Sequence, residues 1–344
     1  MQKKKFRALP EPSLVTAVGI FIVMYGLLLI SSPFERNTFA FGNYVVLFTP
    51  LAIAAVGTTL VLISGGFDLS VAGTISLSNV MAATMLTKNQ GNPMLVILMI
   101  LLVGLAIGLL NGLLIVLLRL QSLAVTLATF IISTGIALMV LPAPGGSAPP
   151  EFTGVLLASI GDIPVALLVL IALGILWSVF RRTRTGSALF AIGADRPAAL
   201  MSGISVIRSE ITTYTVAGGL YAAAGLYLTA VTSSGDPNAG RPFLLTAFAA
   251  MALGLVSFRG GSGNAVAAIF GAASLMTIPK LLFGMGVADF WVGAFQGLII
   301  LVALSIPVVT RYLKSRAAQK KNTGTAPSLP EPPVSAQNAQ GAAT

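Results

Sequence analysis

The sequence lacks cysteine and histidine altogether, and only 9% of its 344 residues are charged. Without cysteine the chain can form no disulfide and has no thiolate nucleophile. Without histidine it has no histidine metal ligands and no serine–histidine catalytic pair. It also contains no Gly-x-x-x-x-Gly-Lys-Ser/Thr loop, the sequence that cradles nucleotide phosphates. No catalytic and no metal-binding residue is therefore predicted.

Apolar sequence is abundant instead, since 56% of the residues are hydrophobic, more than a soluble globular protein can cover. A membrane helix needs roughly 20 mostly apolar residues. Ten runs of about this length occur, and the eighth is short enough to be a partial or tilted span. They predict an all-α membrane protein with about ten transmembrane helices at 14–32, 43–64, 69–87, 94–118, 122–142, 162–180, 211–232, 243–257, 264–284 and 290–310.

The charges indicate how the chain is oriented. Twenty Lys and Arg stand against ten Asp and Glu, giving a net charge of +10, and the basic residues flank the apolar runs rather than forming a nucleic-acid-binding face. With the amino-terminus inside, sixteen Lys and Arg are cytoplasmic and four are external, whereas the acidic residues divide five and five. The positive-inside rule therefore predicts a multi-pass protein of the bacterial cytoplasmic (inner) membrane, with both termini cytoplasmic.

This orientation divides the chain into three parts: a basic cytoplasmic amino-terminus at 1–13, a transmembrane domain at 14–310, and a basic cytoplasmic segment followed by a disordered tail at 311–344. The tail is rich in Pro, Ala, Ser and Gln, which offer little apolar surface to repay the entropy of ordering. Two turn-rich external loops at 142–150 and 236–240 either simply connect spans or meet an external partner.

The segment Gly65-Gly66-Phe67-Asp68-Leu69-Ser70-Val71-Ala72-Gly73 combines a helix break with an acidic residue. Asp68 or Ser70 can cap the third span, because their oxygens accept hydrogen bonds from the free amides at a helix start. The paired glycines at Gly65 and Gly66 are also typical of a broken helix that lines a translocation pathway. The segment is therefore predicted to serve either as a structural cap or as part of the pathway.

Two further patterns concern packing. The stretches 62–66 and 256–261 each end a span with paired glycines and precede a helix rich in small residues, which predicts a fold of two related halves. Gly104, Gly108 and Gly112 recur at every fourth position. Such a stripe lets two helix backbones approach closely, so tight packing is expected, with helix sliding as the alternative.

The long polar interruption at 181–210 must lie in water, because its backbone and charges cannot lie in hydrocarbon. It contains a predicted short helix at 197–201 that Asp195 caps and that ends near Gly203. Leu200, Met201 and Ile204 would give this helix an apolar face. The face is expected to dock a partner, or else to pack beneath the chain's own spans.

Three motifs bring a family resemblance. Residues 185–206 resemble the cytoplasmic coupling segment of ribose-type sugar ABC transporter permeases, which are inner-membrane components of binding-protein-dependent transport systems. Residues 65–73 resemble that family's Gly-Gly-x-Asp-Leu-Ser-Val motif, and 234–240 with 247–254 resemble a third signature region. The likeness extends over about residues 48–308. It implies that the ATPase-coupling residues are Gly193, Asp195, Pro197, Ala198, Leu200, Met201, Gly203 and Ile204, and that Gly65, Gly66, Asp68 and Ser70 belong to the pathway or its helix break.

The resemblance implies an importer in which this chain translocates a sugar or sugar-like solute. Its expected partners are ABC ATPase subunits, a second permease subunit, a periplasmic or lipid-tethered solute-binding protein and membrane lipids, but no nucleic acid. ATP would be bound by the ATPase subunits, and the chain itself would need no cofactor. The sequence leaves open which solute is carried, which residues contact it and whether the two permeases are identical.

Two other functions fit the sequence less well than a permease does. An ion-coupled secondary transporter or channel normally needs ionisable residues inside its spans, and here only Asp68, Lys280 and Asp289 lie near enough, each close to a predicted helix end. A membrane-embedded enzyme would need a cluster of acids, bases or metal ligands, and no span contains paired carboxylates. The ABC permease is the preferred reading, and the chain is not expected to be an enzyme.

Overall fold

The computed structural model describes residues 12–88, 92–288, 290–295, 297–298, 301–302 and 305. Every element described below belongs to one compact unit within residues 1–304. In the tenth predicted span, 290–310, the described residues 290–295, 297–298, 301–302 and 305 are helical, and the others lie outside the described residues. The predicted terminal segments, 1–13 and 311–344, lie outside them too, except for residues 12 and 13.

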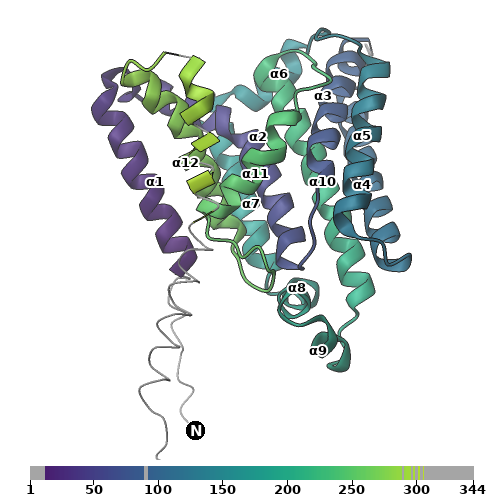
Figure 1. Ribbon diagram of the computed structural model, residues 1–344. Coiled ribbons are helices and arrows are strands. Elements are labelled where there is room, and N and C mark those ends of the chain that lie inside the picture. Colours follow the sequence, from purple (N-terminus) through teal and green to yellow (C-terminus); the bar gives the residue numbers. More distant parts are fainter. Residues whose placement is uncertain are drawn as a thin grey trace, which may run out of the picture. The chain divides into compact units, whose positions relative to one another are not determined.

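The described residues are almost entirely helical, as predicted (Figure 1). Besides the helices there are one 3₁₀ turn, η1 (Pro33–Glu35), and one antiparallel hairpin of β1 (Ser159–Ile160) and β2 (Ile163–Pro164). The α-helices are α1 (Pro12–Ser31), α2 (Thr38–Ile63), α3 (Ser70–Lys88), α4 (Pro93–Leu117), α5 (Ser122–Val140), α6 (Pro150–Leu157), α7 (Val165–Phe180), α8 (Arg184–Ala194), α9 (Arg196–Met201), α10 (Val206–Thr232), α11 (Arg241–Leu253) and α12 (Ala265–Gly284).

Six of these helices are long and apolar enough to cross a membrane, namely α1, α2, α4, α5, α10 and α12. A seventh candidate span arises if α7 and α8, which meet at a bend of 76°, are counted as one. The helices α3 and α11 are apolar but shorter. Within the described residues the chain is therefore an all-α membrane protein with several spans, while the count of ten crossings stays a prediction.

Helix α10 packs against α2, α3 and α4. The glycines of α4 make its contact with α10 possible: a Cβ on Gly104 would lie only 2.5 Å from the Gly218 oxygen, and one on Gly108 would overlap the Tyr214 oxygen. Such spacing leaves no room for any side chain between the two backbones. The predicted tight packing of this glycine stripe is confirmed.

Several elements differ from the sequence-based expectation. Helix α6 lies in a stretch that was expected to be loop, and the β1–β2 hairpin extends into the predicted sixth span. The hairpin turns at Gly161, where φ is +61°, so α7 begins only at Val165. Helix α8 was not predicted as a helix. Helix α10 begins at Val206, five residues earlier than expected, so it includes charged residues that were assigned to the loop.

The eighth predicted span is a short helix preceded by a segment of turns. Helix α11 has 13 residues and is about 20 Å long, less than the roughly 30 Å of bilayer hydrocarbon. The chain before it runs along α3, where Gly240 N donates to Ser76 Oγ at 2.9 Å and Asp236 N donates to Asn79 Oδ1 at 2.7 Å. Non-helical backbone is tolerated at membrane depth when the protein itself satisfies its polar groups in this way.

Candidate functional site

The segment 65–73 joins α2 to α3 and holds the predicted acidic cap. Gly65 has a φ of +87°, a conformation that favours glycine and turns the chain at the end of α2. Asp68 is fully buried, and its Oδ1 accepts hydrogen bonds from Ser70 N at 2.9 Å and Ser70 Oγ at 2.5 Å. Of the two predicted roles, the structure shows Asp68 bonded to the first residue of α3, as a cap requires, and a place in the translocation pathway stays a prediction.

A buried polar network extends from this cap to α4 and α5. Asn111 of α4 donates from Nδ2 to Ser70 Oγ at 3.0 Å, and its Oδ1 accepts from Thr129 Oγ1 of α5 at 2.9 Å. Thr126 Oγ1 accepts from Leu69 N at 3.1 Å. The second oxygen of Asp68, Oδ2, makes no hydrogen bond with the described residues. The start of α3 is thus held by polar side chains inside an otherwise apolar bundle.

Sequence reasoning overlooked Asn111 and Thr129. The signal for Asn111 was present, because it is the only asparagine in the apolar run at 94–118, and a polar residue inside a span usually has a specific partner. The signal for Thr129 was absent, because a threonine in a membrane helix can satisfy its hydroxyl with the preceding turn.

The polar interruption at 181–210 folds into α8 and α9, which lie together at one end of the helices in Figure 1. Thr183 caps α8 by accepting a hydrogen bond from Gly186 N at 3.1 Å. Asp195 caps α9 by accepting from Ala198 N at 3.0 Å, and Pro197 lies in the first turn. The short helix therefore starts where the sequence placed it.

The end of α9 also follows the prediction. Gly203 has a φ of +75°, and the next residue, Ile204, donates its backbone N–H to Ala199 O at 3.1 Å, a bond that closes the helix as a Schellman motif does. Leu200 is 50% exposed and Met201 is 84% exposed. Ile204 packs inward beside Ala199 instead, so the exposed apolar face is narrower than expected and consists of Leu200 and Met201.

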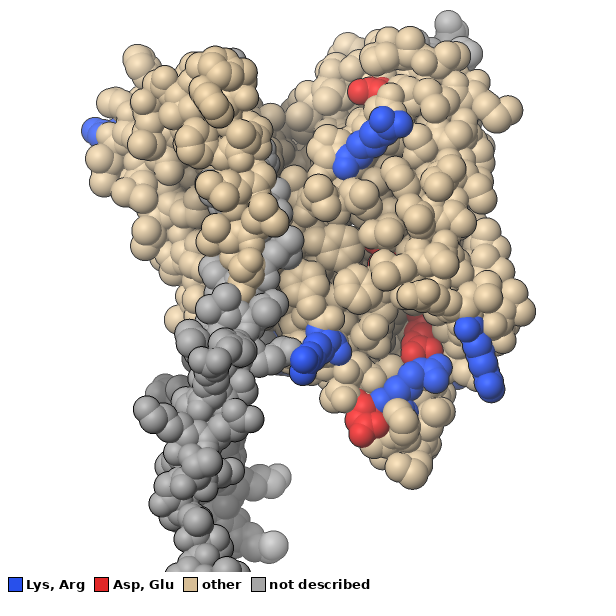
Figure 2. All heavy atoms as spheres, in the orientation of Figure 1, with Lys and Arg blue, Asp and Glu red and all other residues tan. Residues whose placement is uncertain are grey.

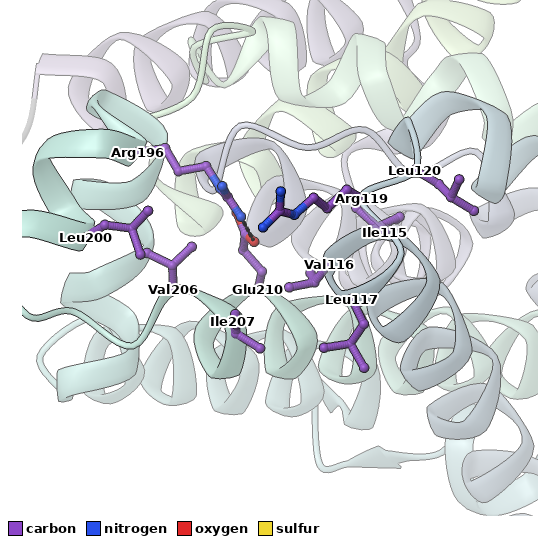
Figure 3. Close-up of a pocket in the computed structure, with 10 residues that line it drawn as sticks. All are labelled: Ile115, Val116, Leu117, Arg119, Leu120, Arg196, Leu200, Val206, Ile207 and Glu210. Carbon is purple, nitrogen blue, oxygen red and sulfur yellow. Dashed lines mark hydrogen bonds and ion pairs between the residues drawn. The ribbon is translucent and has the colours of Figure 1, made fainter.

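A cavity of about 540 Å³ lies beside α9, between the end of α4 and the start of α10 (Figure 3). Arg196 spans it and forms a two-point ion pair with Glu210, with Nε and Nη2 each 3.0 Å from a carboxylate oxygen. The hydrogen bond to Glu210 raises the pKa of Arg196, so the guanidinium stays charged. Arg119, at a φ of +55°, points toward the same carboxylate in Figure 3. The ion pair ties α9 to α10.

The structure brings two groups of predicted residues together. Gly193, at the end of α8, lies against the loop that contains Gly65, whereas Leu200 and Met201 face away from it and are exposed. Among the described residues, no group of three or more His, Asp or Glu side chains lies close enough to hold a metal ion. In this arrangement α8 contacts the loop at the helix break, and α9 is exposed.

Comparison with known proteins gives the family. Residues 40–304 match the family described as the permease component of the branched-chain amino acid transport system. The chain belongs to this family. It therefore is a transport permease with several membrane spans, as the sequence predicted.

Curated relatives cover most of the permease. The ribose import permease protein RbsC of Bacillus subtilis is 33% identical over 294 residues, which are 83% of this chain and 91% of that protein. The galactose/methyl galactoside import permease protein MglC of Haemophilus influenzae is 30% identical over 317 residues, 86% of this chain and 94% of that protein. A probable ABC transporter permease of Sinorhizobium fredii is 32% identical over 281 residues, covering 80% and 82%. No solved structure gives a significant match.

Proposed function

We propose that this permease is the membrane subunit of an ABC importer that translocates a sugar or sugar-like solute. The observation that carries the proposal is the α8–α9 element: a capped, ion-paired helix that presents Leu200 and Met201 to water rather than to the bundle. Exposed apolar side chains with a polar rim are typical of a docking surface. The permease contains no phosphate-binding loop, so the energy of ATP has to arrive through a separate subunit.

The relatives support a sugar rather than an amino acid as the solute. The family description refers to branched-chain amino acid transport, but the curated relatives include permeases for ribose and for galactose or methyl galactoside. The proposed partners are two ABC ATPase subunits, a second permease subunit and a periplasmic or lipid-tethered binding protein. ATP is bound by the ATPase subunits, and the permease needs no cofactor.

The proposal includes a cytoplasmic position for α8, α9 and both termini, with ten crossings. It is supported by the distribution of charge, because in the view of Figure 2 Lys and Arg side chains gather near the end at which α8 and α9 lie. It is also supported by the connections, since α8 and α9 lie at the same end as the α2–α3 and α4–α5 turns.

Two related halves are also part of the proposal. The α2–α3 and α11–α12 connections share one local design: a helix, glycines with positive φ, and a side chain that caps the next helix two residues on. Asp68 Oδ1 accepts from Ser70 N, and Asn264 Oδ1 accepts from Val266 N, both at 2.9 Å. Matching helix breaks in two halves are a feature of transporters built from internal repeats.

Reconstitution tests the proposed function. We expect proteoliposomes that contain the permease, an ABC ATPase and a binding protein encoded beside it to accumulate the sugar only when ATP is enclosed. An uncoupler that collapses the ion gradient should leave the uptake unchanged. Uptake that follows the ion gradient and ignores ATP would instead favour the secondary transporter.

Thiol labelling tests the orientation. The chain has no native cysteine, so single cysteines can be introduced without background. In intact cells, an impermeant maleimide should label Ala143→Cys, which is exposed in the loop before α6. It should spare Ser187→Cys on α8 and Ser262→Cys before α12, which are equally exposed. Permeabilised cells give the control in which all three react. External labelling of Ser187→Cys would contradict the ten-span orientation.

A further inference from the structure

The carboxyl end of α8 meets two helix-break loops at a single point. A Cβ on Gly193 would overlap both the Ile63 carbonyl oxygen at the end of α2 and the backbone nitrogen of Gly261 in the loop before α12. These two groups also bond each other, since Gly261 N donates to Ile63 O at 2.9 Å. Gly193 thus lies against a hydrogen bond that joins the α2–α3 and α11–α12 connections.

The contact is equally close from the other side. A Cβ on Gly260 would lie 2.9 Å from the Gly65 Cα, and one on Gly261 would lie 2.8 Å from the Ala194 nitrogen and Cα. Gly65, Gly260 and Gly261 have φ values of +87°, +80° and +71°, which other residues rarely adopt. Backbone therefore packs on backbone, with no flexible side chain between the three segments to absorb a displacement. We refer to Gly65, Gly193, Gly260 and Gly261 as the glycine junction.

Aromatic side chains reinforce the same connection. Phe67, just after Gly65-Gly66, stacks on Phe248 of α11 with a centroid distance of 6.2 Å, and Phe248 stacks on Phe258 at 6.5 Å. From α7, Trp177 Nε1 donates to Asn264 Oδ1, the cap of α12, at 3.0 Å. The Trp177 ring also lies 6.2 Å from Phe190 of α8. Helix α8 is thus linked to the starts of both α3 and α12.

We infer that the glycine junction transmits displacement of the α8–α9 element to α3 and α12 together, with Gly193 as its positioning residue. The inference rests on the proposed function, because it needs an ATPase that moves α9. Its physical basis is a continuous path of packed groups: α9 is bonded to α10, α8 ends at the junction, and the junction adjoins the caps Asp68 and Asn264. A push on α8 cannot be absorbed locally, so both capped helices move.

The test compares Gly193→Ala with Gly174→Ala in the assembled complex. At Gly174 in α7 an added Cβ meets only Val266 Cγ2 at 3.7 Å, an ordinary contact, so this variant is the matched control. Gly193→Ala leaves the exposed side chains Leu200 and Met201 in place, and co-purification of the ATPase measures whether the complex still assembles. Transport and solute-stimulated hydrolysis should fall by about tenfold relative to the control, in the range of mutations that alter coupling between sites. A complex that keeps its ATPase but loses solute-stimulated hydrolysis is uncoupled, whereas an unstable complex would lose the ATPase as well.

The loop before α12 gives an independent variant. Gly261→Ala pushes on Ala194 from the opposite loop and should uncouple the complex in the same way, and the double variant should transport no worse than the poorer single variant, because both disturb one contact. Transport and stimulated hydrolysis within twofold of Gly174→Ala in both single variants would overturn the inference.

Hydrogen exchange tests the junction without a mutation, and decides the matter if the variants fail to insert. In the native complex, the Gly261 amide should be protected from exchange equally in the nucleotide-free and ATP-bound states, since the junction moves as one body. Loss of this protection in either state would show that α2 and the loop separate, which contradicts the inference. Failure of the proposed function would look different, because the native complex itself would then show no ATP-dependent uptake.

Discussion

Replacement of Met201 or Leu200 by aspartate is expected to abolish both co-purification with the ATPase and ATP-dependent transport. The two side chains are the exposed apolar face of α9, at 84% and 50% exposure, and docking would remove them from water. A carboxylate placed in such a contact loses its hydration without gaining a partner, which costs several kcal/mol of association. Pull-down of the ATPase and uptake into proteoliposomes measure the two effects.

The aspartate variants should still fold and insert. Neither side chain belongs to the cluster that packs α9 onto α8, which is formed by Ala188, Ile192, Ala199 and Val206. Met201→Leu is the matched control, since it keeps the volume and the apolar character and should retain ATPase binding within a few fold. If both aspartate variants hold the ATPase and transport normally, α9 is not the docking element.

The short helix α9 could be predicted because its signals are local. Asp195 caps it, Pro197 lies in its first turn and Gly203 ends it, and each of these acts within a few residues along the chain. The exposed face was predicted less well. Ile204 turns inward because α8 is itself a helix that offers an apolar surface, and α8 was missed since its sequence mixes glycine, serine and arginine with apolar residues.

The contacts of Gly193 could not be predicted in this way, although the family resemblance places it among the coupling residues. A glycine inside a helical sequence indicates lower helix stability or a nearby helix end. Here glycine is needed because the backbone contacts Ile63 and Gly261, which are distant in the sequence. The sequence did indicate that 62–66 and 256–261 are alike. It could not show that the two stretches touch, because a resemblance between segments carries no information on their distance.

The spans were predicted most reliably where one hydrophobic run makes one helix, as for α1, α2, α4 and α12. The prediction was weakest around α11. That helix was expected at 243–257 and lies at Arg241–Leu253, because the chain turns at Leu255, where φ is +54°, while the apolar sequence continues to Val256. Hydropathy cannot show where a helix ends inside an apolar run, so the eighth run was expected to extend beyond the carboxyl end of α11.

Asp68→Asn and Asp68→Leu are expected to behave differently, because the structure uses Asp68 as an acceptor of hydrogen bonds. One carboxylate oxygen, Oδ1, accepts from both the backbone N–H and the hydroxyl of Ser70, and Ser70 in turn accepts from Asn111. An amide oxygen in the same place can accept the same two bonds. Asp68→Asn should therefore keep most of the transport activity and nearly the native melting temperature.

Asp68→Leu removes the acceptor and leaves the donors of Ser70 buried without a partner. Each such group costs about 1–3 kcal/mol, so the variant should melt well below the native protein and transport poorly. Thermal unfolding in detergent, followed by the fluorescence of the tryptophans, measures the first effect, and uptake into proteoliposomes measures the second. Thr246→Val, which removes a hydroxyl that bonds only within its own helix, is the control for loss of a polar group.

The comparison between Asp68→Asn and the native protein decides whether the charge matters. If Asp68→Asn melts like the native protein and yet transports nothing, the negative charge of Asp68 is itself required. Such a result would assign the charge of Asp68 a role in transport rather than in the stability of the fold.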